Sequence, residues 1–148
     1  MANTIVGPFP CYENKFVIGT NAEDATAVAN VETFSVSFDN GVEEWTPYEN
    51  EGWMSRLPTA KALTISVTGK RTIGDTGNDF VAGMTFKNGR NAMAYFAWTF
   101  PDGTKVEMEN AVINVTNVGA GDSTGVAPLE FEVMSNGKPT VTLPTASA

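Results

Sequence analysis

Apolar and polar side chains alternate along much of this 148-residue chain. An alternation with a period of two places successive side chains on opposite faces of a β-strand, so each alternating segment predicts a strand with one buried face. The predicted strands are residues 15–20, 31–39, 60–69, 92–100, 105–118 (with a break near Asn110) and 128–134. The chain is therefore expected to be a mainly β domain, a β-sandwich or partial barrel.

One short helix is expected to flank the strands, between Asn78 and Phe86. Asn78 or Asp79 can cap its start, and the apolar residues that follow have helical spacing. The preceding segment, residues 22–30, fits either a helical turn or a loop. Residues 139–148 form a small, polar, proline-containing tail that no predicted core explains. The length suits a single domain with one hydrophobic core, residues 1–148.

The segment 39–58 is too long for an ordinary turn between two predicted strands. Hairpin loops usually have about two to five residues, and a longer loop is commonly functional or disordered. Disorder would leave several large side chains in water: Trp45, Tyr48, Trp53, Met54 and Leu57. We therefore expect a projecting loop whose tryptophans contact a partner surface. The alternative is that the loop folds back and covers an open end of the sandwich.

The composition limits the chemistry that the chain can support. It has 17 acidic and 9 basic residues, no histidine and one cysteine, and its formal net charge is −8. An acidic surface repels phosphate, so nucleic-acid binding through counterion release is not expected. The absence of histidine excludes His-based triads and His-ligated zinc. Cys11 can form no internal disulfide and is expected to be packed.

No leader or membrane segment is expected. The first nine residues lack the basic start and apolar centre of a signal peptide. No apolar run approaches the roughly eighteen residues that a membrane helix needs. These features favour a soluble protein of a reducing compartment.

Charge is unevenly distributed along the chain. Residues 16–55 carry eight acidic side chains and neither lysine nor arginine. Residues 56–105 have a net charge of +4, and residues 106–148 have a net charge of −4. Because head-to-tail association pairs two different patches of one subunit, this segregation is compatible with self-association.

Two short motifs could suggest a ligand site. The glycines of residues 119–125 lack the spacing of a nucleotide-binding motif and are expected to form a loop. Asp75, Asn78 and Asp79 could contact a calcium ion, but helix capping and a turn explain the same residues. We therefore predict no metal-binding and no cofactor-binding residues.

Two pairs of glutamates share a strand face, Glu107 with Glu109 and Glu130 with Glu132. A glycosidase needs two carboxyl groups that face each other across a cleft, which a single strand face does not provide. A solvated sheet face is the simpler interpretation. No catalytic residue is predicted, and the chain is not expected to be an enzyme.

Carbohydrate binding by a non-catalytic β-sandwich is the alternative function that the aromatic residues suggest. Trp98 shares its predicted face with two phenylalanines and is expected to lie in the core. Trp45, Tyr48 and Trp53 are then the candidates for a rim on which sugars stack.

Several segments occur together in a specific order. They are FSVSFDNGVEEWTP at 34–47 with GW at 52–53, LTISVTGK at 63–70, GDTGNDFVA at 74–82, FAWTFPDGT at 96–104, and GDST at 121–124 with PLEFE at 128–132. As an ordered set they resemble the tail tube (major tail) proteins of long-tailed bacteriophages and related prophage or tail-like particles. The resemblance covers residues from about 15 to 139.

The resemblance implies a self-assembling structural protein. Such proteins form hexameric rings that stack into a hollow tube, and strands from neighbouring subunits complete one continuous barrel around the lumen. A long loop, here 39–58, contacts the neighbouring ring. The ring-stacking residues would be Glu43, Glu44, Trp45, Tyr48, Trp53 and Met54.

The resemblance also implies that DNA passes through the lumen without specific binding. The residues expected to face the lumen are small hydroxyl side chains and glutamates: Thr33, Ser35, Ser37, Thr64, Ser66, Thr68, Glu107, Glu109, Glu130 and Glu132. An acidic wall of small residues offers DNA no attractive phosphate contacts. The implied partners are other copies of the chain and other tail proteins, namely tape measure, tail terminator and baseplate or tip. The implied location is the virion tail, after synthesis in the bacterial cytoplasm, with no membrane partner.

Overall fold

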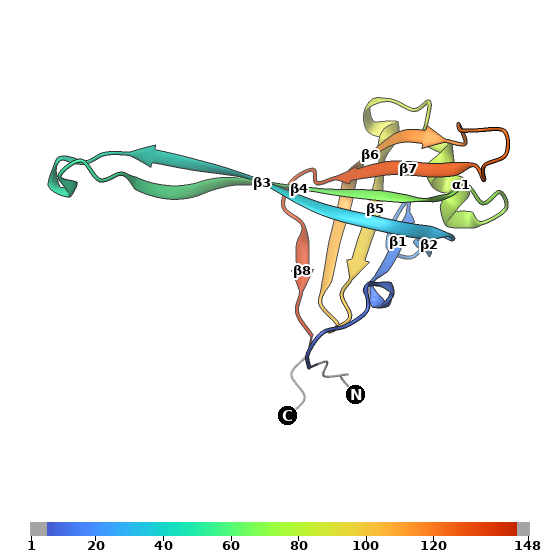
Figure 1. The fold of residues 1–148 in the computed structure, drawn as a ribbon, viewed down its shortest axis with the longest axis horizontal. Coiled ribbons are helices and arrows are strands. Elements are labelled where there is room, and N and C mark those ends of the chain that lie inside the picture. Colours follow the sequence, from blue (N-terminus) through green and yellow to red (C-terminus); the bar gives the residue numbers. More distant parts are fainter. Residues whose placement is uncertain (1–5, 145–148) are drawn as a thin grey trace.

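The computed structural model describes residues 6–144 and shows an antiparallel sheet with one short α-helix (Figure 1). The strands are β1 (Lys15–Gly19), β2 (Thr26–Ala27), β3 (Val31–Trp45), β4 (Ser55–Lys70), β5 (Met93–Thr99), β6 (Lys105–Val118), β7 (Pro128–Met134) and β8 (Thr140–Thr142). The helix α1 spans Thr76–Gly83, and the 3-10 helices are η1 (Cys11–Glu13), η2 (Tyr48–Asn50) and η3 (Gly89–Ala92). The strands pair in the order β2-β1-β5-β6-β7-β4-β3, and β8 pairs with the start of β6. The mainly β architecture expected from the sequence is confirmed.

The sheet curls around one hydrophobic core without closing. Its largest fully buried apolar side chains come from four strands and the helix: Ile18, Ile65, Val81, Phe96, Leu129, Phe131 and Val133. Phe16 of β1 packs edge-on against Phe34 of β3, with ring centroids 4.7 Å apart, although no backbone ladder joins these strands. The ring centroid of Trp98 lies 5.6 Å from that of Phe34 and 4.2 Å from that of Phe100. Aromatic side chains therefore hold the two ends of the curled sheet together as a partial barrel.

The helix α1 packs against β1, β2 and β6 and contributes Val81 to the core. It begins after Asp75, whose carboxylate accepts a hydrogen bond from the backbone nitrogen of Asn78 at 3.0 Å. The sequence correctly predicted a helix here, but the predicted caps, Asn78 or Asp79, lie three and four residues after the observed cap. Gly77 lies so close to the strand β2 that an added Cβ would sit 2.3 Å from the carbonyl oxygen of Ala27. Only glycine allows this approach of helix and strand.

Asn78 is fully buried and links three segments of backbone. Its amide nitrogen donates to the carbonyl oxygens of Ala29, at 3.2 Å, and Lys70, at 2.9 Å. Its amide oxygen accepts from the backbone nitrogen of Thr72 at 3.0 Å and from Nη1 of Arg71 at 2.8 Å. These contacts use the full hydrogen-bonding capacity of the side chain. They explain why Asn78 lies inside the helix and does not cap it.

Strands β3 and β4 continue beyond the body of the sheet as a projecting hairpin, here called the arm (residues 39–62; Figure 1). The prediction of a loop over 39–58 is wrong in its local structure, because the ladder continues from the pair Asp39–Ala62 to the pair Trp45–Ser55. Only residues 46–54 form a tip, which contains η2. The alternation that predicts strands was missing because neither face of the arm is buried by the body.

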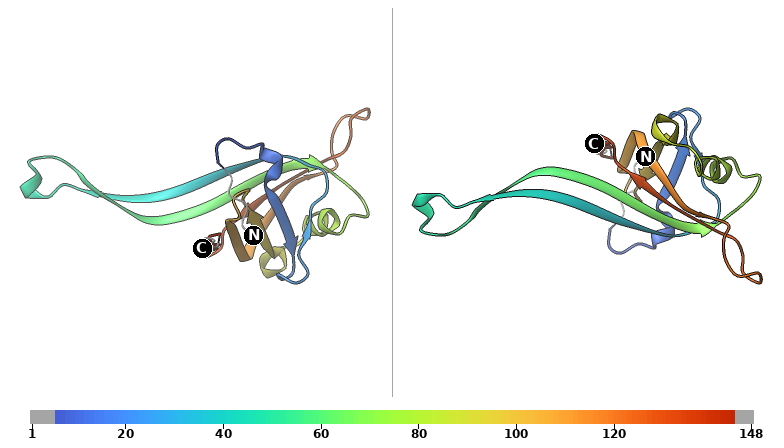
Figure 2. Two further views of the ribbon diagram at one scale, coloured as in Figure 1. Left: turned by 90° about the horizontal axis from the view of Figure 1, so that it is seen from below. Right: turned by 90° about the horizontal axis from the view of Figure 1, so that it is seen from above.

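The arm does project, as the sequence analysis expected. The alternative, that this segment folds back over an open end of the sandwich, is wrong, because the arm extends away from the body in every view (Figures 1 and 2). The segment 22–30 is also settled: it consists of turns around β2 and contains no helix.

Two smaller expectations need correction. Cys11 is exposed and not packed. Part of the C-terminal tail is ordered into β8, whose residues pair with residues 105–107 of β6. The last four residues of the predicted tail, 145–148, lie outside the described residues.

We expect the Asn78→Ala variant to unfold about 2–4 kcal/mol more easily, because buried backbone groups lose their partners. Urea denaturation followed by circular dichroism would measure this loss. Asn88→Ala, in the exposed segment between α1 and η3, is the matched control and should change stability by less than about 0.5 kcal/mol. Equal effects of the two substitutions would contradict this role for Asn78.

Candidate assembly surfaces

Four neighbouring strands, β3, β4, β7 and β6, present one continuous surface, here called the polar face. Two cross-strand rows form its centre: Thr33, Thr68, Glu130 and Asn117 in one, and Ser35, Ser66, Glu132 and Asn114 in the next. Ser37 and Thr64 pair in an adjacent row. The intervening residues of the same strands point to the opposite side, where Ile65, Val67 and Phe131 are buried. The structure thus brings eight of the ten predicted lumen residues onto one face.

Two asparagines on β6 hold the glutamates of β7 in place. Asn117 donates from Nδ2 to Oε2 of Glu130 at 3.1 Å, and Asn114 donates to Oε1 of Glu132 at 3.2 Å. A hydrogen bond to a carboxylate restricts the rotation of its side chain. Neither asparagine was predicted from the sequence, because their role depends on β6 being the neighbour of β7.

At the edge of the polar face, the positive charge of Lys70 is balanced by the carboxylate of Glu32. Lys70 of β4 lies 3.1 Å from the carboxylate of Glu32, and both side chains are partly exposed. Glu32 occupies an irregularity of β3, between the paired residues Val31 and Thr33. The uncompensated charge of the polar face is therefore that of Glu130 and Glu132.

Glu107 and Glu109 lie elsewhere on β6. Their part of the strand pairs with β5, and Glu107 also pairs with β8, whereas β7 pairs with β6 only from Val112 onward. Glu107 forms a salt bridge of 3.4 Å with Lys105. Glu109 and Asn110 both lie opposite the single residue Tyr95. This two-against-one pairing is a β-bulge in β6. The structure does not bring these two glutamates into the rows that contain Glu130 and Glu132.

The pKa of the Tyr95 phenol is sensitive to the region that contains Glu107 and Glu109. The side chain is 3% exposed. Burial, followed by a hydrogen bond with Glu107 and the negative charges of Glu107 and Glu109, raises the pKa of Tyr95 to about 12. Ionising this phenol would place a buried negative charge near the two glutamates.

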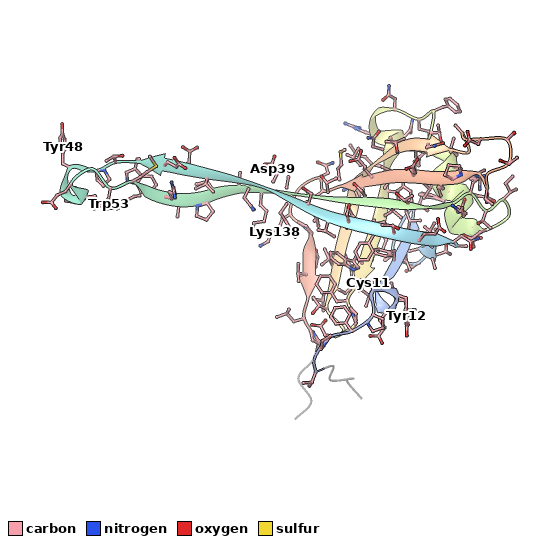
Figure 3. All side chains as sticks on the ribbon, viewed as in Figure 1. Cys11, Tyr12, Asp39, Tyr48, Trp53 and Lys138 are labelled. Carbon is pink, nitrogen blue, oxygen red and sulfur yellow. The ribbon has the colours of Figure 1, made fainter. Side chains whose placement is uncertain are left out.

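The tip of the arm exposes a group of large side chains. The exposed fractions are 48% for Trp45, 79% for Trp53 and 48% for Met54, while Tyr48 is fully exposed. Glu44 pairs with Arg56 across the arm at 3.3 Å, and both side chains remain accessible. Figure 3 shows Tyr48 and Trp53 together at the far end, remote from the body. The predicted ring-stacking residues thus share one projecting element, where solvated apolar side chains favour contact with a partner.

The residues considered for other functions have structural roles. Asp75 caps α1 and also accepts from the backbone nitrogen of Ala29 at 3.0 Å. Asp79 accepts from Arg71 at 2.8 Å, and this hydrogen bond holds the pKa of Asp79 below its usual value. In the described part of the chain, no cluster of three or more His, Cys, Asp or Glu side chains could hold a metal ion.

The aromatic residues give little support to a sugar-binding rim. Trp98 packs among other aromatic rings and donates from Nε1 to Oδ1 of Asn14 at 3.0 Å. Neither of the two large hollows of the body is lined by Trp45, Tyr48 or Trp53.

Within residues 6–144, no helix has the length and apolar character needed to cross a membrane.

The chain shares its fold with subunits of phage-like tails and tubes. A chain from the tail of an empty gene transfer agent (GTA) particle, computed with C6 symmetry, has a TM-score of 0.71 and 22% identity, covering 91% of this chain and 99% of that chain. A chain of the anti-feeding prophage tube-terminating cap has a TM-score of 0.57 and 14% identity, covering 96% and 95%. A chain of the sheath-tube complex of the extracellular contractile injection system PVC has a TM-score of 0.55 and 15% identity, covering 93% of this chain and 93% of that chain.

The sequence itself matches no protein-family model and no curated protein. At these low identities, the likeness to solved structures establishes the fold. The resemblance drawn from the sequence is thereby confirmed at the level of architecture, and the functional consequences are inferred below.

We expect the Glu107→Gln variant to lower the pKa of Tyr95, but not to its ordinary value of about 10, because burial is the larger cause. Near-ultraviolet titration of the protein and of Tyr95→Phe would isolate this phenol by difference. Glu130→Gln is the matched control and should leave the titration unchanged. Because folding raises this pKa, its contribution to stability is complete below about pH 10 and is lost as the pH rises toward 12. A Tyr95 pKa unaffected by Glu107→Gln would contradict the placement of Glu107.

Proposed function

We propose that this chain is a structural subunit of a phage-type tail tube, forming hexameric rings that stack around a lumen through which DNA passes. The observation that carries the proposal is the polar face: a four-strand surface of small hydroxyl side chains and two ordered glutamates. The shared fold supports it, since one of the matched chains comes from a tail with C6 symmetry. In this proposal the protein acts by polymerising, and it performs no chemistry.

The edges of the polar face support ring closure. β3 is the last strand of the sheet and has a strand neighbour, β4, on one side only. Within the described residues, β6 from Ile113 to Val118 has β7 on one side and no strand on the other. Long unpaired edges favour pairing with another chain. Pairing β3 of one subunit with β6 of the next would join the four-strand units into one barrel.

The dimensions of such a barrel are compatible with DNA passage. Six copies of four strands, spaced about 4.8 Å apart, give a circumference of roughly 115 Å and a backbone diameter of about 37 Å. Strand tilt would widen this further. After side chains are subtracted, the bore would still accommodate a DNA duplex.

The chemistry of the polar face suits a wall that does not retain DNA. Basic side chains bind DNA by releasing counterions from its phosphates, and each contact adds to affinity. Lys70, a basic residue on this face, is paired with Glu32. Glu130 and Glu132, held by Asn117 and Asn114, would repel the phosphates evenly. Glu107 and Glu109 lie on the part of β6 that does not pair with β7, so we assign the acidic wall to Glu130 and Glu132.

The proposal also defines the setting of the protein. The subunits would stack through the arm, and the tube would end at other tail proteins such as a terminator and a baseplate or tip protein. A tape measure protein and then DNA would occupy the bore. The protein would be made in the bacterial cytoplasm and reside in the tail of the particle.

Removing the arm should leave a folded subunit that no longer forms tubes. Replacing residues 42–59 by Asn-Gly would close a two-residue hairpin between the paired residues Gly41 and Ala60. Circular dichroism should show an intact sheet, because the arm contributes nothing to the core. Negative-stain microscopy should show tubes for the wild type and none for the variant. Tubes of normal length from the armless chain would contradict the stacking role.

Reversing charge on the polar face should make the bore retain DNA. We expect tubes of the variant carrying Glu130→Lys and Glu132→Lys to bind short duplex DNA, with an affinity that falls as salt is raised. The variant with Glu13→Lys and Glu23→Lys has the same change in charge outside the polar face and serves as the control. Co-sedimentation of fluorescent DNA with tubes would measure binding. Equal binding by the two variants would mean that Glu130 and Glu132 do not line the bore.

A further inference from the structure

An apolar groove of about 710 Å³ opens at the base of the arm. Its large apolar lining residues flank the base of the arm or belong to the rest of the body: Phe38, Leu63, Trp98, Phe100, Val106 and Val141. Its two charged lining residues are Lys61 and Lys138, which are both exposed. Lys61 also lies 5.8 Å from the centroid of the Phe38 ring. The groove therefore suits a ligand that is apolar with acidic flanks.

The tip of the arm has this complementary character. Trp53 and Tyr48 are its most exposed aromatic side chains. Glu49 and Glu51 lie between them in the sequence. In the described part of the chain, these two glutamates form no salt bridge, and neither do Lys61 and Lys138. The charges of the tip and of the groove are thus both uncompensated within one subunit.

A subunit cannot place its own tip in its own groove. Phe38, which lines the groove, and Trp45, where the tip begins, are seven residues apart on one strand, or roughly 23 Å at about 3.3 Å per residue. The paired ladder of the arm is continuous over this distance, apart from one irregularity between Gly41 and Val42. Figures 1 and 2 show the arm leading away from the body. An occupant of the groove with the chemistry of the tip must come from a second copy.

We propose that this groove is the docking site for the arm tip of a second copy of the chain, with Glu49 and Glu51 beside Lys61 and Lys138. The inference rests on the proposed self-assembly and specifies the surface that receives the arm. The tip and the groove are different patches, so the contact is heterologous and repeats from one ring to the next. Complementary charge at the rim fixes orientation and partner choice.

The second large hollow of the body is less suited to the tip. It has about 840 Å³ and lies along the open seam between β1 and β3. Its charged lining residues are Lys15 and Glu32, which have opposite signs, and Glu32 is already paired with Lys70. An acidic tip gains no net attraction there. Charge therefore favours the groove at the base of the arm.

Charge exchange tests the contact directly. We expect the tip variant (Glu49→Lys with Glu51→Lys) and the groove variant (Lys61→Glu with Lys138→Glu) each to reduce the protein found in sedimenting tubes by at least about tenfold, because like charges then meet. Mixing the two variants should restore tubes, since each tip then meets a groove of opposite charge. One chain with all four substitutions should also assemble. All four side chains are exposed, and circular dichroism would verify folding.

The outcomes separate this inference from the proposed function. If the wild type forms no rings or tubes, the proposed function fails. If the wild type forms tubes and both variants form them equally well, or if mixing restores nothing, the docking site is wrong while the tube function stands.

Cross-linking gives a second test that does not depend on charge. In a Cys11→Ser background, oxidation of tubes with Glu49→Cys and Lys138→Cys should give a ladder of covalent oligomers. Lys87→Cys replaces Lys138→Cys in the control, because Lys87 is an exposed lysine beyond α1. A ladder from the control pair and none from the first pair would overturn the proposed site.

Discussion

The antiparallel register of β3, β4, β7 and β6 is the constraint on which the rest of the molecule depends. It places hydroxyls and carboxylates on one face, and Ile65, Val67 and Phe131 in the core on the other. Because side chains alternate strictly, a slip of one residue would bury Ser66 and expose its neighbours. The core therefore enforces the polar face: the burial that stabilises the fold also determines which side chains are presented for assembly.

The sequence was most informative where one face of a strand is buried. Alternation around Phe34, Leu63 and Phe131 predicted the strands, and with them the grouping of the small polar residues and Glu130. The same pattern could not separate Glu107 from that group, because the bulge opposite Tyr95 and the change of neighbour from β7 to β8 are tertiary features. The alternation pattern also predicted no strand in the arm, because the arm pairs along its backbone while neither of its faces is buried.

The body and the arm obtain their order in different ways. The body has a packed core and the buried hub at Asn78, which ties the end of β4 to α1 and to the turn before β3. The arm has a backbone ladder and cross-strand contacts such as Glu44 with Arg56. An isolated two-stranded ribbon is at best marginally stable in water. Its tip thus has more to gain from a neighbouring molecule than any other part of the chain.

The arm leaves the body on one side only (Figure 1), so the subunit has two unlike ends. A stack built by placing each arm on the next ring inherits this direction. In the proposed tube, one terminus would display free arms, and the other would display vacant receiving surfaces. Growth would then proceed differently at the two termini, and a protein that stops elongation at one would meet a different surface at the other. The asymmetry of a single hairpin would thereby call for two distinct terminating partners and give the proposed filament a front and a back.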